Sequence, residues 1–150
     1  MELKMNSRLT TIGAVALGLS MGSLAMAHGA VEHETENKRL KFFENAQQME
    51  LASMEEPGVA AFFDDIVGSG NPKSPISCGL FKIDAGNPLV YTYDYDDIKM
   101  MLEGSITFSD GEQEVTAEAG DVLFFPNGST ITFSTESSGL AFACGQRAEF

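Results

Sequence analysis

The chain has 150 residues, of which 22 are acidic and 9 are basic, so its formal net charge is −13 at pH 7. This length predicts one domain. A surface this acidic repels nucleic acid and anionic lipid and suits a soluble exported protein or a cationic ligand. We therefore expect no nucleic-acid-binding function.

Residues 1–27 have the features of a secretory signal peptide. Lys4 and Arg8 supply a positively charged start, an apolar stretch follows at 9–24, and Ala25-Met26-Ala27 fits a cleavage site. The sequence therefore predicts a secreted or periplasmic protein that has no contact with the membrane after cleavage. An uncleaved anchor is the alternative, although Thr, Ser and Gly interrupt the apolar stretch.

The rest of the chain divides into a polar lead-in, residues 28–50, and a folded domain, residues 51–150. At the border, residues 40–55 are compatible with a short helix or a first strand. From residue 59 onward the sequence alternates short apolar segments with turn sequences: VAAFFDDIV, SPISCGLFKI, LVYTYDY, IKMMLEGSITFS, EQEVTAEA, DVLFFP, TITFSTE and GLAFACG. Many short strands without a long helix predict an all-β antiparallel sandwich or barrel.

Two turns and two cysteines add detail to this prediction. Asp110-Gly111 predicts a tight hairpin, and Pro126-Asn127-Gly128 predicts a sharp corner after a buried strand. Cys78 and Cys144 lie in strand-like segments that could be neighbours in a sheet. Two buried free thiols are favoured over a disulfide, which stays the alternative.

The spacing of several residues resembles that of the cupins, which are double-stranded β-helix (jelly-roll) barrels. Counted back from Gly104, the two histidines and the glutamate of the first cupin motif fall on Tyr91, Tyr93 and Asp97. In the second motif, Gly120 and Pro126-Asn127-Gly128 match, and the histidine position is Ile131. The resemblance implies a cupin barrel whose metal-binding histidines have been replaced.

We expect no metal and no cofactor, because zinc, iron, nickel or copper in such a barrel needs imidazole or thiolate ligands. The only histidines, His28 and His33, lie in the lead-in, where chelation of copper by the mature N-terminus is a minor alternative. A ferric site made by Tyr91, Tyr93 and Asp97 is another minor alternative.

Within the cupins, residues 74–146 resemble the ethanolamine-utilisation protein Q (EutQ) family. Tyr95-Asp96-Asp97-Ile98, followed by Leu102-Glu103-Gly104, is similar to the family segment Y-D-E-I-x-x-V-L-E-G, and PNGSTITF at 126–133 is similar to P-K-G-S-x-I-x-F. Family members are credited with acetate kinase activity, and some are linked to microcompartments. Asn127 replaces the family's lysine, and export would separate this chain from ATP, which disfavours a kinase here.

Strand alternation places the side chains of Tyr91, Tyr93, Tyr95 and Asp97 on one face, unless a bulge intervenes. In a cupin this face lines the barrel, so we expect a metal-independent pocket for a small molecule, an amine or a sugar. The expected ligand-binding residues are Tyr91, Tyr93, Tyr95, Asp97, Ser129, Ile131 and Phe133. An aromatic cage with one carboxylate suits an ammonium group. Equally, the tyrosines are compatible with an ordinary hydrogen-bonded core.

The alternative to a binding module is an enzyme. Tyr95, Asp97 and Glu103 are the candidate acid and base groups for isomerase, epimerase or lyase chemistry. The acetate kinase reaction is implied only by the resemblance, because the sequence lacks a phosphate-binding G-x-x-x-x-G-K-[ST] loop. The cupin resemblance also implies a homodimer.

Overall fold

The computed structural model describes residues 39–150, so the predicted signal peptide and most of the polar lead-in lie outside the described residues. Residues 40–150 form one compact unit. It contains a short 3-10 helix, η1, and eight strands: η1 (Ala46–Gln48), β1 (Ala61–Gly68), β2 (Ser77–Asp84), β3 (Leu89–Thr92), β4 (Asp97–Ser109), β5 (Glu114–Glu118), β6 (Val122–Phe125), β7 (Thr130–Ser134) and β8 (Ser138–Gly145).

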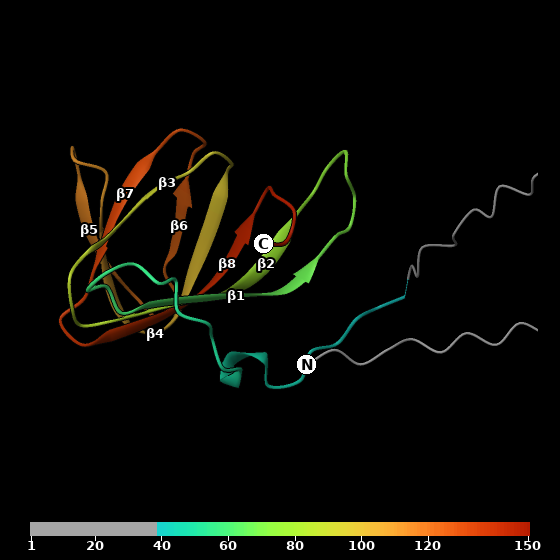
Figure 1. Ribbon diagram of the computed structural model, residues 1–150, viewed down its shortest axis with the longest axis horizontal. Helices are drawn as coiled ribbons and strands as arrows, with labels where there is room; N and C mark the ends of the chain where they lie inside the picture. Colours follow the sequence, from blue (N-terminus) through green and yellow to red (C-terminus); the bar gives the residue numbers. More distant parts are fainter. Residues whose placement is uncertain (1–38) are drawn as a thin grey trace, which may run out of the picture. The chain divides into compact units, whose positions relative to one another are not determined.

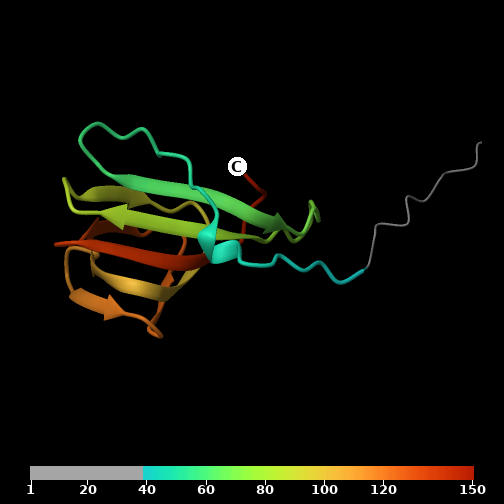
Figure 2. The same cartoon turned by 90° about the horizontal axis from the view of Figure 1, so that it is seen from below.

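The strands form a curled antiparallel sheet that closes around one core (Figures 1 and 2). Its order is β1-β2-β8-β4-β7-β3, and β5 and β6 also pair with β4. The first half of β4 pairs with β6 and β8, and its second half pairs with β5 and β7. The predicted jelly-roll barrel of the cupin type is therefore confirmed in its all-β architecture.

A bulge in the middle of β4 makes this double pairing possible. The register between β4 and β8 shifts between Met101 and Glu103, and Gly104 has a φ of 64°. A side chain at Gly104 would also collide with the backbone oxygen of Ser138, because its Cβ would lie 2.1 Å away. The extra residue reverses the face on which the later side chains of β4 lie, as bulges do.

The core lies between the inner faces of the strands and is rich in aromatic rings. Phe108, Phe125 and Phe133 contact one another with centroid distances between 5.3 and 5.9 Å. Their packing is supported by other buried side chains, including Ile83, Ile106 and Met101. This core surrounds one end of a cavity that contains the predicted tyrosines.

Both predicted turns are present. Ser109 pairs with Glu114 in the β4–β5 hairpin, where the Asp110 carboxylate accepts hydrogen bonds from the N–H groups of Glu112 and Gln113. At the corner after β6, the N–H of Ser129 donates to the Pro126 carbonyl. The N–H of Gly128 donates to the carbonyl of Tyr93, so this corner also fixes the tyrosine segment.

The two cysteines form a disulfide, so the expectation of two free thiols was wrong. Cys78 on β2 is directly opposite Cys144 on β8, with their Cα atoms 4.1 Å apart. The sequence suggested neighbouring strands but could not supply this register. Because the two residues are directly opposite each other, their sulfur atoms are within bonding distance.

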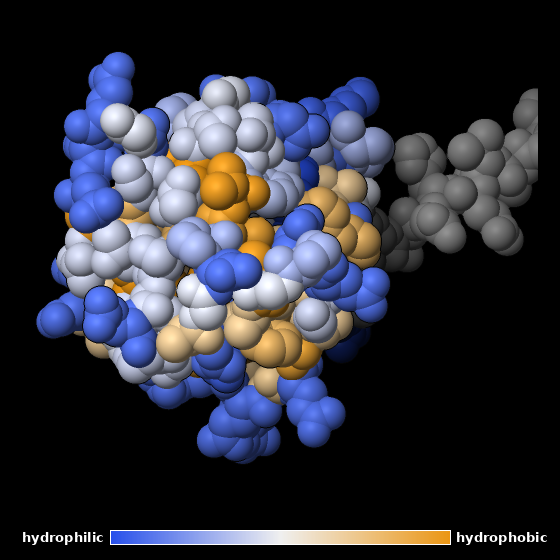
Figure 3. Space-filling model, turned by 60° about the vertical axis from the view of Figure 1, so that its left-hand side comes forward, coloured by the Kyte–Doolittle hydropathy of each residue, from blue (hydrophilic) through white to orange (hydrophobic). Residues whose placement is uncertain are grey.

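The surface of the molecule is partly polar and partly apolar (Figure 3). On the face shown in Figure 3, polar side chains cover most of the surface, and apolar side chains gather near the centre. Within residues 39–150, no helix has the length and hydropathy needed to cross a membrane.

Candidate functional site

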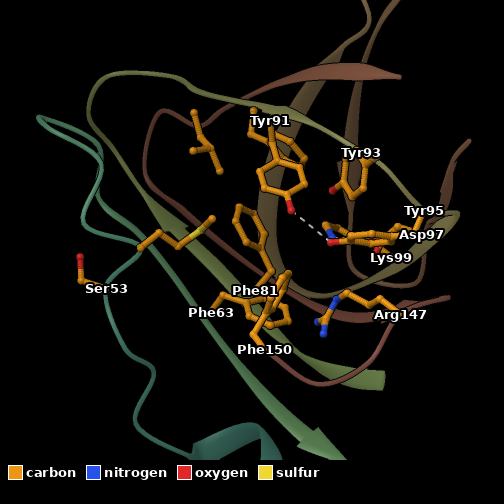
Figure 4. A pocket seen from close by; sticks show the side chains of 13 residues that line it. Ser53, Phe63, Phe81, Tyr91, Tyr93, Tyr95, Asp97, Lys99, Arg147 and Phe150 are labelled. Atoms are coloured by element: carbon orange, nitrogen blue, oxygen red, sulfur yellow. Dashed lines mark hydrogen bonds and ion pairs between the residues drawn. The ribbon is translucent and has the colours of Figure 1, made fainter. Parts of the chain in front are cut away.

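A cavity of about 320 Å³ opens into the barrel between the β1–β2 side and the β3–β7 side (Figure 4). Most of its wall is apolar or aromatic, and three charged side chains reach it. Its lining residues are Ser53, Met54, Phe63, Phe81, Leu89, Tyr91, Tyr93, Tyr95, Asp97, Lys99, Phe133, Arg147 and Phe150. This volume is at the lower end of the range of small-molecule sites, so the cavity suits a small ligand.

The tyrosine segment enters the cavity by simple alternation. Tyr91, Tyr93, Tyr95 and Asp97 all line it, whereas the residues between them are exposed. The Tyr91 and Tyr95 hydroxyl groups point toward each other, with their oxygen atoms 3.4 Å apart (Figure 4). The alternation continues to Lys99, which sequence reasoning did not include in the site although the same period of two predicts it.

Lys99 and Asp97 form a buried ion pair at the base of this wall. The Lys99 Nζ donates to Asp97 Oδ1 at 2.7 Å, and the two side chains are only 5% and 4% exposed. The ammonium group also lies 5.5 to 5.7 Å from the ring centroids of Phe81, Tyr93 and Phe125. Of these three rings only Tyr93 belongs to the tyrosine cage predicted for an amine ligand, so the ammonium group of the protein itself lies against one ring of that cage.

Burial dominates the pKa values of this pair. It lowers the pKa of the Lys99 amine, and the nearby Asp97 charge opposes this shift only in part. Burial likewise raises the pKa of the Asp97 carboxyl, against the effect of the Lys99 charge. Both shifts favour the neutral forms, so the free energy of moving the proton from Lys99 to Asp97 is smaller than it would be in water.

Arg147 brings a second cation to the cavity, from the segment after β8. Its guanidinium makes a bidentate ion pair with Asp65 on β1, with N–O distances of 2.9 and 2.8 Å, and lies 3.8 Å from the centroid of the Phe150 ring. The Ser77 hydroxyl donates to the Arg147 carbonyl and fixes the backbone there. The Nε–H of Arg147 is buried and has no acceptor among residues 39–150.

No local sequence signal points to Arg147. It lies 52 positions after Tyr95, and only the pairing of β8 with β4 brings the two together. Gly145, two residues earlier, is needed for this approach, because a Cβ there would lie 2.8 Å from the Tyr95 ring.

Tyr93 and Tyr95 keep their protons, because the pKa of each phenol is raised. Burial, followed by the negative charge of Asp97, raises the pKa of the Tyr93 phenol far above its ordinary value. Burial and the hydrogen bond with Tyr91 likewise raise the pKa of Tyr95. Tyr93 and Tyr95 can therefore donate hydrogen bonds to a ligand but are poor bases and poor metal ligands.

Asp65 makes the stability of the β1–Arg147 contact depend on pH. Burial alone would raise the pKa of Asp65, but the hydrogen bonds from Arg147 and the Phe150 N–H, with the Arg147 charge, outweigh burial and lower it. A pKa that is lowered in the folded state stabilises the protein at pH values above the unfolded-state pKa of 3.8. This stabilisation disappears as the pH falls through the folded-state pKa.

We therefore predict that the free energy of unfolding decreases when the pH is lowered from about 5 to about 2. The variant Asp65→Asn should lose part of this dependence, as measured by urea unfolding across that range. The control is Asp84→Asn, which removes a carboxylate whose ion pair with Lys82 is exposed. Equal pH slopes for Asp65→Asn and the wild type would contradict the prediction.

Three predicted site residues lie elsewhere. Glu103 is exposed on the outer surface and accepts a hydrogen bond from the Gln47 side chain, because the bulge after Met101 turns it outward. Ser129 and Ile131 line a separate hollow near Phe125 and Pro126, and the Ser129 hydroxyl there has no partner among the described residues. Phe133, by contrast, lines the main cavity as expected.

The residues at the cupin metal position do not fit a metal ion. Tyr91 is directly opposite Ile131, and the Asp97 carboxylate is already bound by an ammonium group. A divalent cation there would be repelled by Lys99 and would have no imidazole ligand from the barrel. Among residues 39–150, no group of three His, Cys, Asp or Glu side chains is arranged to hold a metal ion.

Comparison with curated proteins finds relatives of the same name, one through a short match and another through a longer match. The chain is 48% identical over 48 residues to the acetate kinase EutQ of Escherichia coli K12, which is 32% of this chain and 21% of that protein. The acetate kinase EutQ of Clostridioides difficile 630 is 26% identical over 107 residues, 62% of this chain and 68% of that protein. The match therefore spans about a fifth of the length of the E. coli relative.

Solved structures agree with the fold. The ethanolamine utilization protein Q of Salmonella typhimurium LT2 superposes with a TM-score of 0.53 at 30% identity, covering 59% of this chain and 71% of that one. A cupin superfamily protein of Desulfitobacterium hafniense superposes with a TM-score of 0.53 at 14% identity, covering 72% and 92%, which shows the fold alone. The family model of the ethanolamine utilisation protein EutQ matches residues 30–143, so the chain belongs to the EutQ family of cupins.

Proposed function

We propose that this protein binds a small carboxylate in its barrel cavity without a metal ion. The observation that carries this proposal is the charge of the cavity wall. Lys99 and Arg147 reach it, whereas Asp97 is the only carboxylate among the lining residues. The Arg147 Nε–H is buried and has no partner among residues 39–150, whereas most buried polar groups in proteins have one.

Local charges outweigh the overall acidity in this argument. The net charge of −13 repels anions at long range, but exposed charges beyond about 8 Å are largely screened at physiological ionic strength. Lys99 and Arg147 are each paired with one carboxylate, Asp97 or Asp65, but both have further N–H groups with which a ligand at the cavity could form hydrogen bonds. Hydrogen bonds from the Tyr91 and Tyr95 hydroxyls would complete the binding of a carboxylate group.

We predict that acetate, lactate or benzoate raises the melting temperature of the protein, and that Arg147→Met reduces the affinity by about tenfold to a hundredfold. This range corresponds to one hydrogen bond to a charged group. Calorimetric titration measures the affinity. Because Arg147 also binds Asp65, the variant Asp65→Asn serves as a control for damage to that contact.

An amine or a sugar is the competing ligand class that the sequence suggested. An ammonium ligand against Tyr93 would lie close to the Lys99 ammonium group, and the repulsion between the two positive charges makes the carboxylate the better fit. Ethanolamine, choline and simple sugars therefore belong in the same thermal-shift series. Stabilisation by one of these, with no effect of any carboxylate, would contradict the proposal.

Acetate kinase activity is a second candidate, because the E. coli and C. difficile relatives carry that name and acetate belongs to the proposed ligand class. The cations at the cavity could also contact a phosphoryl group. Release of ADP from ATP in the presence of acetate tests this candidate. The activity should disappear in Arg147→Met if the barrel cavity is the site.

We further propose that the protein is exported. The disulfide supports this, since such bridges persist mainly in oxidising compartments, and so do the sequence features of residues 1–27. The mass of the protein isolated from its host tests both points, because cleavage after Ala27 and an intact disulfide each change the mass in a defined way.

The proposed homodimer has a candidate surface on the outer face of the sheet. Ile98 and Met100 on β4 are exposed beside Phe124 and Val122 of β6, with which they pair directly, and Phe142 lies next to Met100. An apolar patch of this kind is typical of an interface. We expect light scattering to give twice the monomer mass and Phe124→Glu to give a monomer. A monomeric wild type would refute the dimer.

A further inference from the structure

We propose that Lys99 captures small 2-oxo acids by forming a Schiff base with their carbonyl group. This inference extends the proposed binding of carboxylates to a covalent step at the same cavity. Its basis is the position of Lys99. The Lys99 side chain lines the cavity, is only 5% exposed, forms an ion pair with Asp97 and lies close to the tyrosines (Figure 4).

The surroundings of Lys99 match what this chemistry requires. A lysine amine becomes a nucleophile when it lies in a desolvated pocket or close to another cation. Phe81, Tyr93 and Phe125 surround Nζ, and burial lowers the pKa of the amine. The positive charge of Arg147 lowers it further.

Asp97 has the position to move the necessary protons. Its carboxylate, 2.7 Å from Nζ, takes one proton from the ammonium group, and the raised pKa of Asp97 favours this transfer. The neutral amine then attacks the carbonyl carbon. The new C–N bond forms while the carbonyl electrons move to oxygen, which receives the second proton of the nitrogen and gives a carbinolamine.

In the second half of the reaction, protonated Asp97 returns its proton to the carbinolamine hydroxyl, which leaves as water. The nitrogen lone pair then forms the C=N bond. The net change joins one ammonium group and one carbonyl compound and releases one water and no proton, so no oxidant or other reactant is needed. The product is a protonated Schiff base whose positive charge remains paired with the Asp97 carboxylate.

The second cation explains the preference for an oxo acid over a simple aldehyde. Figure 4 shows the head groups of Lys99 and Arg147 at the same cavity, on different walls. With the carbonyl carbon at Lys99, the carboxylate of a 2-oxo acid would lie in the same cavity as the Arg147 guanidinium, whose positive charge attracts it. The small cavity limits the ligand to a short chain.

The test uses pyruvate as the probe and sodium cyanoborohydride to trap an imine on the intact protein. Peptide mass mapping then identifies the modified lysines. Lys82 is a matched reference in the same molecule, because its Nζ lies 2.8 Å from Asp84 and beside an aromatic ring, but its side chain is 42% exposed. We expect the reduced pyruvate adduct on Lys99 to form at least about tenfold faster than on Lys82, as a desolvated amine with a positioned acid should.

Labelling of Lys99 at a rate equal to or below that of Lys82 would overturn the inference. Lactate carries a hydroxyl in place of the keto group of pyruvate, so it can bind as a carboxylate but cannot form a Schiff base. It therefore separates failure of the Schiff base from failure of the carboxylate site. If lactate and pyruvate both stabilise the protein but Lys99 is not labelled, the binding proposal stands and the Schiff base is refuted. Lys99→Arg should form no adduct at residue 99, and the mapping on the wild type does not depend on the folding of this variant.

Discussion

Replacing Asp97 with Asn is expected to lower the free energy of unfolding by about 3–5 kcal/mol, because it leaves the Lys99 ammonium buried without its partner. Both side chains of the pair are 5% exposed or less, so water cannot replace the lost charge. The loss has an upper limit, because Lys99 can release its proton instead of remaining charged. Keeping a lysine of ordinary pKa neutral at pH 7 costs about 5 kcal/mol. Urea unfolding with linear extrapolation measures the change.

The chain contains its own control for this prediction. Lys82 and Asp84 have the same spacing of two residues on a strand and a similar N–O distance, but their side chains are 42% and 36% exposed. Asp84→Asn should therefore cost no more than about 1 kcal/mol. The double variant D97N/K99M should recover part of the loss. Equal effects of Asp97→Asn and Asp84→Asn would show that burial does not determine the strength of the pair.

The second large effect is expected from the disulfide. Changing Cys78 and Cys144 together to Ala should destabilise the protein by about 4 kcal/mol, because the bridge closes a loop of 66 residues in the unfolded chain and a loop of this length loses about that much entropy. The measurement compares urea midpoints of the oxidised wild type and the double variant.

A reducing agent provides the control. It should lower the midpoint of the wild type toward that of the double variant and leave the double variant unchanged. Identical midpoints for oxidised and reduced wild type would contradict the prediction. The pairing of Cys78 with Cys144 joins β2 to β8, so the loss should also loosen the segment that carries Arg147.

The tyrosine wall shows how far sequence reasoning reaches into the site. Side chains on a strand alternate between two faces, so placing Tyr93 on the inner face placed Tyr91, Tyr95 and Asp97 there as well. The same rule includes Lys99. The cupin motifs give no sign of its role, because they mark histidine positions, whereas Lys99 comes from the same strand two residues after Asp97.

Glu103 shows where that rule ends. Its number has the parity of Asp97 and Lys99, but the bulge after Met101 turns it outward, and Ile106 and Phe108 point inward instead. Gly104 suggested an unusual backbone conformation, but the sequence did not show where the extra residue of the bulge lies. A bulge depends on the register of the neighbouring strand, which a single segment does not contain.

The sequence by itself determined the all-β barrel, its hairpin and corner, the cupin spacing and the alternating tyrosine wall, because these depend on short-range periodicity and turn chemistry. The tertiary structure alone decided the disulfide, the arrival of Arg147 beside Tyr95, and the packing of the Lys99 ammonium group among Phe81, Tyr93 and Phe125. Each of these depends on which strands pair and in which register. That choice follows from packing of the whole core, and the segments involved are more than 60 residues apart in the case of the disulfide.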